Sequence, residues 1–197
     1  TLEENTDRPF GPDDFKFTTN QIWTIYPDGS IELQAAITSN NPAVVLARLG
    51  YEIGVPAQYD RFAYYGRGPV DNYNDRKTGA FIQQYSSTVA EQFTNWPKPM
   101  QMGNHEETRW TSLSNAKGKG ILVVNEKPYA VSALNHNAMD MTMATHPHKL
   151  PKRDVTYLTV DAVVTGLGGN SCGQGGPLVH DRAFGAPTRM GFIIRPV

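Results

Sequence analysis

The chain has 197 residues, which fits one large domain or two small ones. Its 18 basic and 19 acidic side chains nearly balance, and this excludes a nucleic-acid binder, because phosphate binding needs a surplus of Lys and Arg. The hydrophobic share of 39% excludes wholesale disorder, and the single Cys excludes an internal disulfide and a multi-cysteine metal site.

The first predicted element is a β-hairpin that follows a polar start. Residues 1–14 are polar, contain two prolines and predict a loop or an incoming linker. Apolar side chains then alternate with more polar ones over 31–37, as in a strand with one buried face. The run 21–26 joins this strand through Pro27-Asp28-Gly29, where Pro presets φ and Gly accepts a positive φ. We therefore expect an antiparallel hairpin here.

Further short strands follow along the chain. Most are bounded by Gly or Pro, and they are predicted at 49–55, 61–65, 121–124, 129–134, 158–164 and 190–194. Two short helices are expected, around 86–93 and around 135–144. Short strands with Gly and Pro turns and few helical stretches are typical of a sandwich or barrel. Because no internal repeat and no domain boundary is visible, the chain is predicted to form a single all-β domain.

The sequence shows no membrane or targeting signal. The longest apolar stretches are too short to span a bilayer, and no basic region is followed by an apolar one as in a signal peptide. The chain starts with Thr1 rather than Met, as in a mature, processed or excised segment, so the absence of a signal says little about the parent protein. The compartment stays open between cytoplasm and periplasm.

The most unusual segment is the glycine-rich stretch Gly166–Gly176. Its part Gly169–Gly173 matches the G-x-S-x-G pattern of a nucleophile elbow, but no helix pattern follows, and only His180 and Asp181 lie downstream as partners. A phosphate-binding loop also needs a helix N-terminus after it. Two interpretations stay open: a loop whose glycines let the backbone approach a ligand closely, or a strained connection with no ligand.

The histidines and paired glutamates have simpler explanations than catalysis. His146-Pro-His148 could bring two imidazoles together, but no further ligand stands at a recognisable spacing for a metal. His105 is followed by Glu106 and Glu107 but lacks the second His of a zinc-protease motif, so surface or hydrogen-bonded histidine is preferred. The two glutamates are adjacent, so on a strand they face opposite ways and cannot act as a facing catalytic pair.

The run from Asp71 to Asp75 alternates oxygen side chains as Ca²⁺ loops do. It lacks the Gly and the distant Glu of such a loop, and we therefore prefer a turn in which Asn and Asp cap their own backbone. Ion pairs with carboxylates of this kind are expected from Arg67, Arg76 and Arg109.

Four ordered segments together resemble one family. The first, Tyr65–Lys77, is similar to a signature G-x-G-P-x-E-N-Y-x-D-R, with Asp71 where Glu is usual. The others follow in the family's order and spacing: Met102–Trp110, Thr145–Leu150, and Val160-Asp161 leading into Gly166–Gly173. The chain therefore resembles the C-terminal β-sandwich domain of the large β-galactosidases of glycoside hydrolase family 2.

The resemblance implies an antiparallel supersandwich like that of galactose mutarotases. It implies that 1–197 is the later part of that domain, because an earlier family segment around R-A-P-x-D-N-D is missing. It also implies a parent enzyme that hydrolyses terminal β-D-galactosides such as lactose with retention. In the family, the catalytic glutamates and the Mg²⁺ ligands lie on a (β/α)₈ barrel that has no counterpart here. The expected chain thus holds no catalytic residue, metal ligand or cofactor of its own and is inactive alone.

The resemblance also implies partners and a binding role. The expected partners are the barrel and other domains of the same polypeptide, a galactoside substrate and further copies when full length, with no nucleic acid or membrane. The glycine-rich loop of the family borders the sugar at the barrel mouth, where well-known members place a Trp and this chain has Cys172. A thiol offers a small apolar contact without a ring face. Asn170 and Ser171 are expected to supply hydrogen bonds to the sugar.

One alternative is an independent carbohydrate-binding module. Such a module needs an exposed aromatic platform, for which Trp96 or Trp110 with Tyr64 and Tyr65 are the candidates. Large aromatics more often serve the core or an interface. If the chain is instead an excised domain, we expect a large exposed apolar patch near Cys172, where the barrel would pack.

Overall fold

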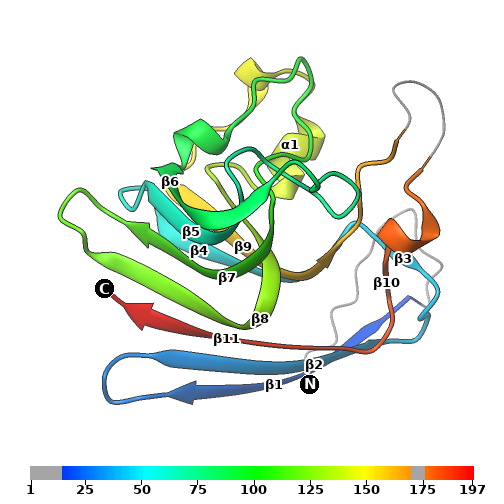
Figure 1. The fold of residues 1–197 in the computed structure, drawn as a ribbon, viewed down its shortest axis with the longest axis horizontal. Coiled ribbons are helices and arrows are strands. Elements are labelled where there is room, and N and C mark those ends of the chain that lie inside the picture. Colours follow the sequence, from blue (N-terminus) through cyan, green and yellow to red (C-terminus); the bar gives the residue numbers. More distant parts are fainter. Residues whose placement is uncertain (1–14, 170–175) are drawn as a thin grey trace.

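The computed structural model describes residues 15–169 and 176–197, and almost all of its regular structure is antiparallel β-sheet (Figure 1). The predicted loop at 1–14 lies outside the described residues. The strands are β1 (Phe17–Ile25), β2 (Ile31–Ser39), β3 (Val45–Leu46), β4 (Arg48–Pro56), β5 (Arg61–Gly68), β6 (Phe81–Thr88), β7 (His105–Ser114), β8 (Gly120–Leu134), β9 (Val155–Val164), β10 (Ala183–Phe184) and β11 (Thr188–Pro196). The helical elements are α1 (Ala138–Met143) and the 3₁₀ turns Ala90–Gln92, Pro147–Lys149 and Val179–Asp181.

Within the described residues, nine strands form one continuous sheet that curls into two layers. The order is β1-β2-β11-β8-β7-β5-β6, and β9 adds to β8 and carries β4. The long strand β8 pairs with β11 through residues 121–125 and with β9 through residues 130–134. In Figure 1, β1, β2 and β11 run below the other strands. This arrangement confirms the all-β antiparallel sandwich; the supersandwich likeness to galactose mutarotase stays a prediction.

The predicted hairpin is confirmed. β1 and β2 pair without a register break from Phe17 opposite Ser39 to Ile25 opposite Ile31. Gly29 has φ +83°, and the Asp28 carboxylate accepts from the backbone N–H of Ser30 at 2.9 Å. The expected turn chemistry therefore closes the hairpin, and the alternating apolar side chains of β2 face the core.

The core fills the space between the two layers. Phe62 and Tyr64 of β5 stack at 5.1 Å between ring centroids, and Tyr51 of β4 meets Phe192 of β11 edge-on at 5.9 Å across the layers. Stacked and edge-on aromatic pairs are favourable geometries in a dry core. Aliphatic side chains complete the cluster, with Leu33, Leu113, Val123, Val131, Leu158 and Val160 among them.

Two sequence predictions about local structure were wrong. The helix expected around 86–93 is the end of strand β6 followed by one 3₁₀ turn at Ala90–Gln92. The two strands expected at 121–124 and 129–134 form the single strand β8, although Pro128 lies between them. Pro128 has no N–H to donate, and the strand tolerates it because β8 changes partner there and its pairing with β7 is irregular.

The second predicted helix is confirmed as α1. Its first turn is fixed by a capping box in which Asn137 accepts from the Asp140 N–H at 2.8 Å, while the Asp140 carboxylate accepts from the Asn137 N–H. Arg153 then donates to Asp140 at 2.6 Å and holds the helix against the start of β9. In the described ranges, no helix is long and apolar enough to cross a membrane.

Candidate functional site

The glycine-rich stretch leaves and re-enters the fold at one place. The backbone N–H of Gly166, just after β9, donates to the carbonyl of Asp181 at 2.8 Å. Thr165 supports this crossing, because its hydroxyl donates to the carbonyl of Leu46 and accepts from the N–H of Ala183 at 2.8 Å. The two ends therefore lie side by side next to β3 and β10 (Figure 1).

The carboxylate of Asp75 holds the entry side of this stretch. Its two oxygens accept from the backbone N–H groups of Leu167 at 3.1 Å and Gly168 at 2.7 Å. Gly166 packs directly on this carboxylate, where an added Cβ would overlap it. Gly168 has φ +93°, a conformation that side chains disfavour. Glycine is thus required here by both a close contact and the backbone.

The side chain of Asn74 holds the exit side. Its amide nitrogen lies 3.2 Å from the carboxylate of Asp181 and 3.4 Å from the carbonyl of His180. Its oxygen accepts from the ammonium of Lys77 at 3.1 Å, which fixes the orientation of the amide. We call Asn74 and Asp75 the loop anchor, since these neighbours hold the two ends of the glycine-rich stretch.

A buried asparagine fixes the segment that carries the loop anchor. Asn72 donates to the carbonyls of Arg67 at 2.9 Å and Val70 at 3.0 Å, and its own oxygen accepts from the N–H of Glu106 at 2.8 Å. The ring of Tyr73 lies in a small cluster of the core. The predicted capping of local backbone is therefore confirmed for Asn72, whereas Asp71, Asn74 and Asp75 bind other partners.

The expected arginine ion pairs take different partners. Arg76 pairs with Asp71 at 3.0 Å, as expected. Arg67 instead reaches Glu107, with 2.9 Å between Nε and the carboxylate, while Arg109 lies over the ring of Tyr65 at 5.4 Å. The carboxylates of the 71–75 run therefore satisfy only one of the three arginines.

The adjacent glutamates of β7 have separate partners. Glu107 adopts φ +54° and its carboxylate lies 3.3 Å from Lys77. The hydrogen bond from Arg67 holds the pKa of Glu107 below its usual range. Burial raises the pKa of Glu106, whose carboxylate accepts from Asn104 at 2.9 Å. The left-handed backbone at Glu107 interrupts the simple alternation that the sequence predicts, and each carboxylate is engaged on its own.

His105 is a buried, hydrogen-bonded residue, as the sequence analysis preferred. Its ring stacks on Tyr64 at 4.1 Å and lies 3.2 Å from the carbonyl of Arg67 and 2.7 Å from the amide of Gln92. Burial lowers the pKa of His105 to about 4. It is thus a neutral core side chain at physiological pH.

The exposed histidines His146 and His148 form a pair to which no further metal ligand is added among the described residues. His146 and His148 stack at 5.4 Å between ring centroids. In residues 15–169 and 176–197, no three His, Cys, Asp or Glu side chains come together as a metal site.

Asp161 is the most deeply buried carboxylate of the site region. It lies on β9, and its Oδ2 is 3.5 Å from Nη1 of Arg48 on β4. Burial raises the pKa of Asp161 to about 6, although Arg48 opposes this effect. Asp161 is therefore a buried partner of Arg48 within the sheet rather than a ligand group at the surface.

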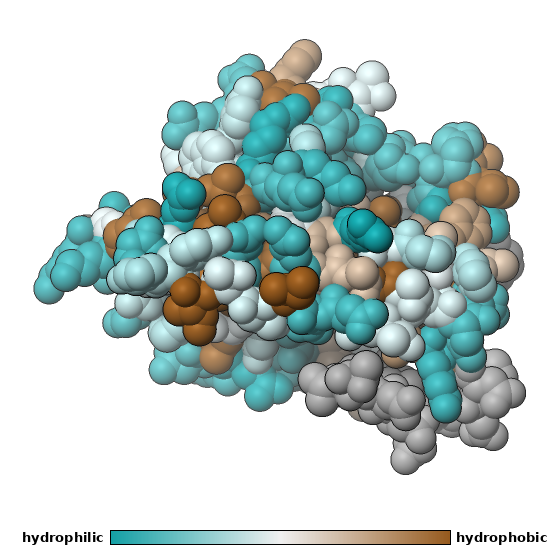
Figure 2. Space-filling model, turned by 90° about the horizontal axis from the view of Figure 1, so that it is seen from below, coloured by the Kyte–Doolittle hydropathy of each residue, from teal (hydrophilic) through white to brown (hydrophobic). Residues whose placement is uncertain are grey.

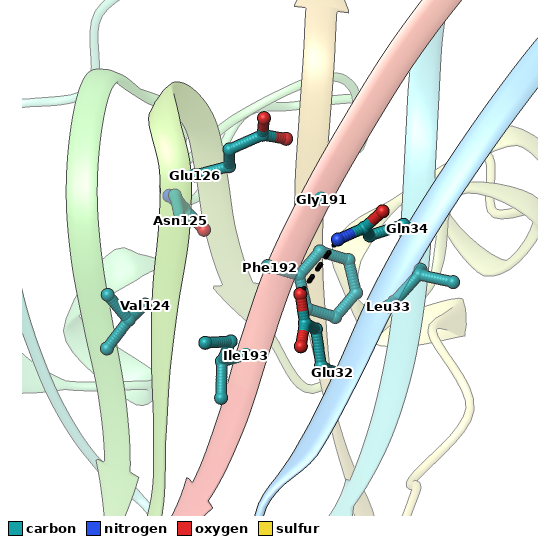
Figure 3. A pocket seen from close by; sticks show the side chains of 9 residues that line it. All are labelled: Glu32, Leu33, Gln34, Val124, Asn125, Glu126, Gly191, Phe192 and Ile193. Carbon is teal, nitrogen blue, oxygen red and sulfur yellow. Dashed lines mark hydrogen bonds between the residues drawn. The ribbon is translucent and has the colours of Figure 1, made fainter. Parts of the chain in front are cut away.

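A pocket of about 190 Å³ lies elsewhere, over Gly191 on the outer face of β2, β11 and β8. Figure 3 shows Glu32 and Glu126 on either side of strand β11 in this pocket. Glu32 accepts from Tyr26 at 2.5 Å and Gln34 at 2.9 Å, and the bond from Tyr26 lowers its pKa. A glycosidase needs one carboxylic acid with a raised pKa beside a carboxylate. The bond from Tyr26 therefore favours the ionised form of Glu32, which is the opposite of what a catalytic acid needs.

Comparison with known proteins decides the family. A family model described as "Beta galactosidase small chain" matches residues 4–194. The chain belongs to the β-galactosidase small-chain family. The small-chain domain is 30% identical over 152 residues to a protein named β-galactosidase from Priestia megaterium, covering 77% of this chain and 15% of that protein. It is 29% identical over 177 residues to a β-galactosidase from Halalkalibacterium halodurans, covering 88% of this chain and 16% of that protein.

A eukaryotic relative gives the same proportions. The small-chain domain is 27% identical over 170 residues to a β-galactosidase of Kluyveromyces lactis, covering 85% of this chain and 16% of that protein. The chain thus spans about 15% of the length of these curated relatives. These relatives therefore contain other domains in the same polypeptide.

The predicted sugar-binding residues of the small-chain domain, Asn170, Ser171 and Cys172, lie outside the described residues, and their role stays a prediction. The sequence analysis named this stretch but missed the loop anchor that holds it. Asn74 and Asp75 stand inside the signature segment, which was the available signal, but no spacing rule connects them to residues more than 90 positions away.

Only part of the aromatic platform of the alternative module assembles, since Tyr65 of β5 lies opposite Trp110 of β7 on one face of the sheet. Tyr64 is 1% exposed and belongs to the core, whereas its neighbour Tyr65 is 38% exposed, because successive side chains of β5 face opposite ways. Trp110 is partly buried. Only Trp96 and Tyr65 of the four candidates are exposed, and they stand on different segments.

Proposed function

We propose that the small-chain domain is part of a β-galactosidase that hydrolyses terminal β-D-galactosides such as lactose with retention. In this proposal, another domain of the polypeptide supplies the two catalytic carboxylates, as nucleophile and as acid and base. In this proposal the Mg²⁺ of the family belongs to that domain too. The small-chain domain then has a supporting role and no turnover of its own.

The loop anchor is the observation that carries this proposal. A long glycine-rich stretch would be expensive to order, since glycine loses more backbone freedom than other residues. Here both ends are held by side-chain and backbone hydrogen bonds from Asn74, Asp75 and Asp181. Holding the ends of such a stretch in place is of use when its tip meets a ligand. In this proposal the stretch borders the sugar.

Within the stretch, three side chains are proposed to face the galactoside. Asn170 and Ser171 would hydrogen-bond to sugar hydroxyls, since amides and hydroxyls both donate and accept. Cys172 would supply a small apolar contact where an aromatic ring stacks in other members. The contact is weaker than ring stacking, because a thiol covers much less of the sugar face.

The surface beside the anchored ends supports docking against another domain. Leu167 precedes the undescribed residues, and Leu178 and Val179 follow them. Their side chains are 48%, 64% and 66% exposed. Apolar side chains that gather at one place of a surface mark an interaction site. We propose that the catalytic barrel of the same polypeptide covers them.

A second exposed region supports the proposal that the sandwich is the later part of a larger one. β1 and β4 are both edge strands of the described sheet, and Trp23 of β1 meets Tyr51 of β4 edge-on at 6.4 Å. Ile22, Trp23 and Ile25 of β1 are about half or more exposed. Trp23 and Ile25 share the face of their β2 partners Leu33 and Ile31, and Ile22 lies on the opposite face. Figure 2 shows hydrophobic side chains on the lower side of the molecule. The edge β1 has no Lys, Pro or bulge, the usual protections of a free edge.

The test compares this chain with the longer polypeptide that carries it. The isolated chain should release no chromophore from a nitrophenyl β-galactoside, whereas the longer polypeptide should. Replacing Cys172 with Trp in the longer polypeptide should lower KM, because a ring adds stacking. Replacing it with Ser is the matched control of equal size. Turnover by the rigorously purified 197-residue chain would contradict the proposed division of labour.

The independent carbohydrate-binding module has less support, because its four candidate aromatics do not all share a face. Calorimetric titration of the isolated chain with galactose and lactose separates the two ideas. Binding at millimolar concentration or tighter would favour the module and contradict a purely supporting domain.

A further inference from the structure

We propose that Asp75 is a positioning residue for galactoside binding, acting through the backbone of Leu167 and Gly168. The inference rests on the function proposed above and assigns a role within it to one side chain of the signature segment. Asp75 itself need not meet the sugar.

The geometry at Asp75 calls for a carboxylate. Each of its two oxygens accepts from a different backbone N–H, at 3.1 and 2.7 Å. Among the described residues, Asp75 has no ion pair, so these two N–H groups are its specific partners. An amide side chain offers one acceptor and would turn its NH₂ group against the second N–H. In Asp75→Asn, one of the two hydrogen bonds is therefore lost, because the side-chain NH₂ group faces a backbone N–H and both are donors.

The other half of the loop anchor is tied to the sheet through charged groups. Asn74 accepts from Lys77 at 3.1 Å, and Lys77 lies 3.3 Å from Glu107 on β7. Glu107 is also held by Arg67 of β5 at 2.9 Å. The exit side is therefore fixed to two central strands. On the entry side, backbone and hydroxyl bonds hold Thr165 and Gly166, and the carboxylate of Asp75 holds Leu167 and Gly168.

This arrangement determines what a change at Asp75 does. The side chain of Asp75 is exposed and contributes nothing to the hydrophobic core. The ties that remain between the two ends are the bonds from the Gly166 N–H to the Asp181 carbonyl and from the Ala183 N–H to the Thr165 hydroxyl. Loss of Asp75 would thus release Leu167 and Gly168 without unfolding the sandwich. The sugar contact weakens in the ground state and the transition state alike, which raises KM more than it lowers kcat.

The first arm of the experiment uses the 197-residue chain. Amide hydrogen exchange at Leu167 and Gly168 is compared between the wild type, Asp75→Asn and Asp71→Asn. Asp71 is a matched control, because it lies in the same segment and binds only the exposed Arg76. Asp75→Asn should speed exchange at both amides roughly tenfold, and Asp71→Asn should not. Unchanged exchange in Asp75→Asn overturns the inference.

A second variant, at Gly166, disturbs the same contact from the glycine-rich side. Gly166 has an ordinary φ, so Gly166→Ala is tolerated by the backbone, but its methyl group overlaps the Asp75 carboxylate. It should speed exchange at Leu167 and Gly168 as Asp75→Asn does. Thermal unfolding of each variant shows that the sandwich stays folded. Faster exchange in all amides at once would indicate global destabilisation and contradict a local role.

The second arm uses the longer polypeptide and a nitrophenyl β-galactoside. Asp75→Asn should raise KM about fivefold to tenfold with kcat within about twofold, and Asp71→Asn should leave both unchanged. Faster exchange with an unaltered KM overturns the inference and leaves the proposed function intact. A wild-type polypeptide without any galactosidase activity overturns the proposed function and this inference with it.

Discussion

Replacing Asp161 with Asn should make the chain more stable at neutral pH. The carboxylate is 2% exposed, and burial raises its pKa from 3.8 to about 6 despite Arg48 at 3.5 Å. Because the pKa is higher in the folded chain than in the unfolded chain, ionisation opposes folding. The contribution of protonated Asp161 to the free energy of unfolding is therefore fully present at acid pH. This contribution falls as the pH rises through 6, by about 3 kcal/mol in total.

The assay is urea unfolding of the wild type and Asp161→Asn between pH 4 and 7.5. Asn keeps the shape of the protonated side chain and never ionises. The gain in unfolding free energy of the variant should be larger at pH 7.5 than at pH 4 by about 2–3 kcal/mol. A gain that does not change with pH would refute the reasoning that ionisation of a buried carboxylate is the cause.

Asp140→Asn is a control with the opposite sign. The hydrogen bond from Arg153 lowers the pKa of Asp140, so its contribution to stability is present at neutral pH and is lost as the pH falls through the folded pKa. This variant should therefore be destabilised at pH 7.5 and less so at acid pH. If both variants changed with pH in the same direction, a general charge effect would explain them better.

His105 opposes Asp161 in the same pH range. Its pKa is lowered from 6.5 to about 4 by burial, so the folded chain loses stability as the pH falls from 6.5 towards 4. In the wild type the two effects partly cancel. Asp161→Asn should expose the effect of His105 as a fall in stability on acidification.

Three further variants test the packing of the sandwich. Tyr129→Phe removes the buried hydroxyl that accepts from the Gly191 N–H at 2.9 Å, and urea unfolding should show a loss of about 1–3 kcal/mol; an unchanged midpoint would contradict this. Phe62→Ala removes a fully buried ring stacked on Tyr64 and should cost about 3–5 kcal/mol, with a cost below 1 kcal/mol as the refuting result. Asn137→Ala removes the helix cap of α1 and should cost about 1 kcal/mol in the same assay, while Asn137→Asp should retain most of it.

The predictable parts of the fold are those in which one face of a strand is buried. β2 alternates between core and solvent, and its hairpin turn follows from Pro27-Asp28-Gly29. β6 was missed because it is an edge strand that is only partly buried on either face, so its sequence shows no alternation of hydrophobicity. Its last residues then suggested a helix that does not form. The periodicity of hydrophobic residues alone could not identify a strand that is partly exposed on both faces.

The candidate site was predictable only in part, because its contacts join distant segments. The signature segment and the glycine-rich stretch are both recognisable in the sequence, but the bond from Asp75 to Gly168 spans 93 positions. Local rules describe turns and helix caps within a few residues. They did identify the polar turn near Asn72, and they missed only which distant backbone its neighbours bind.

Strand β8 couples the two layers of the sandwich, because it belongs to both. Its first half hydrogen-bonds to β11 in one layer and its second half to β9 in the other, along 15 uninterrupted residues. If either layer unfolded, one half of β8 would lose its hydrogen-bonded partner strand, and the pairing of the other half would be weakened. The described body should consequently denature in one cooperative step, with its layers sharing a single transition temperature.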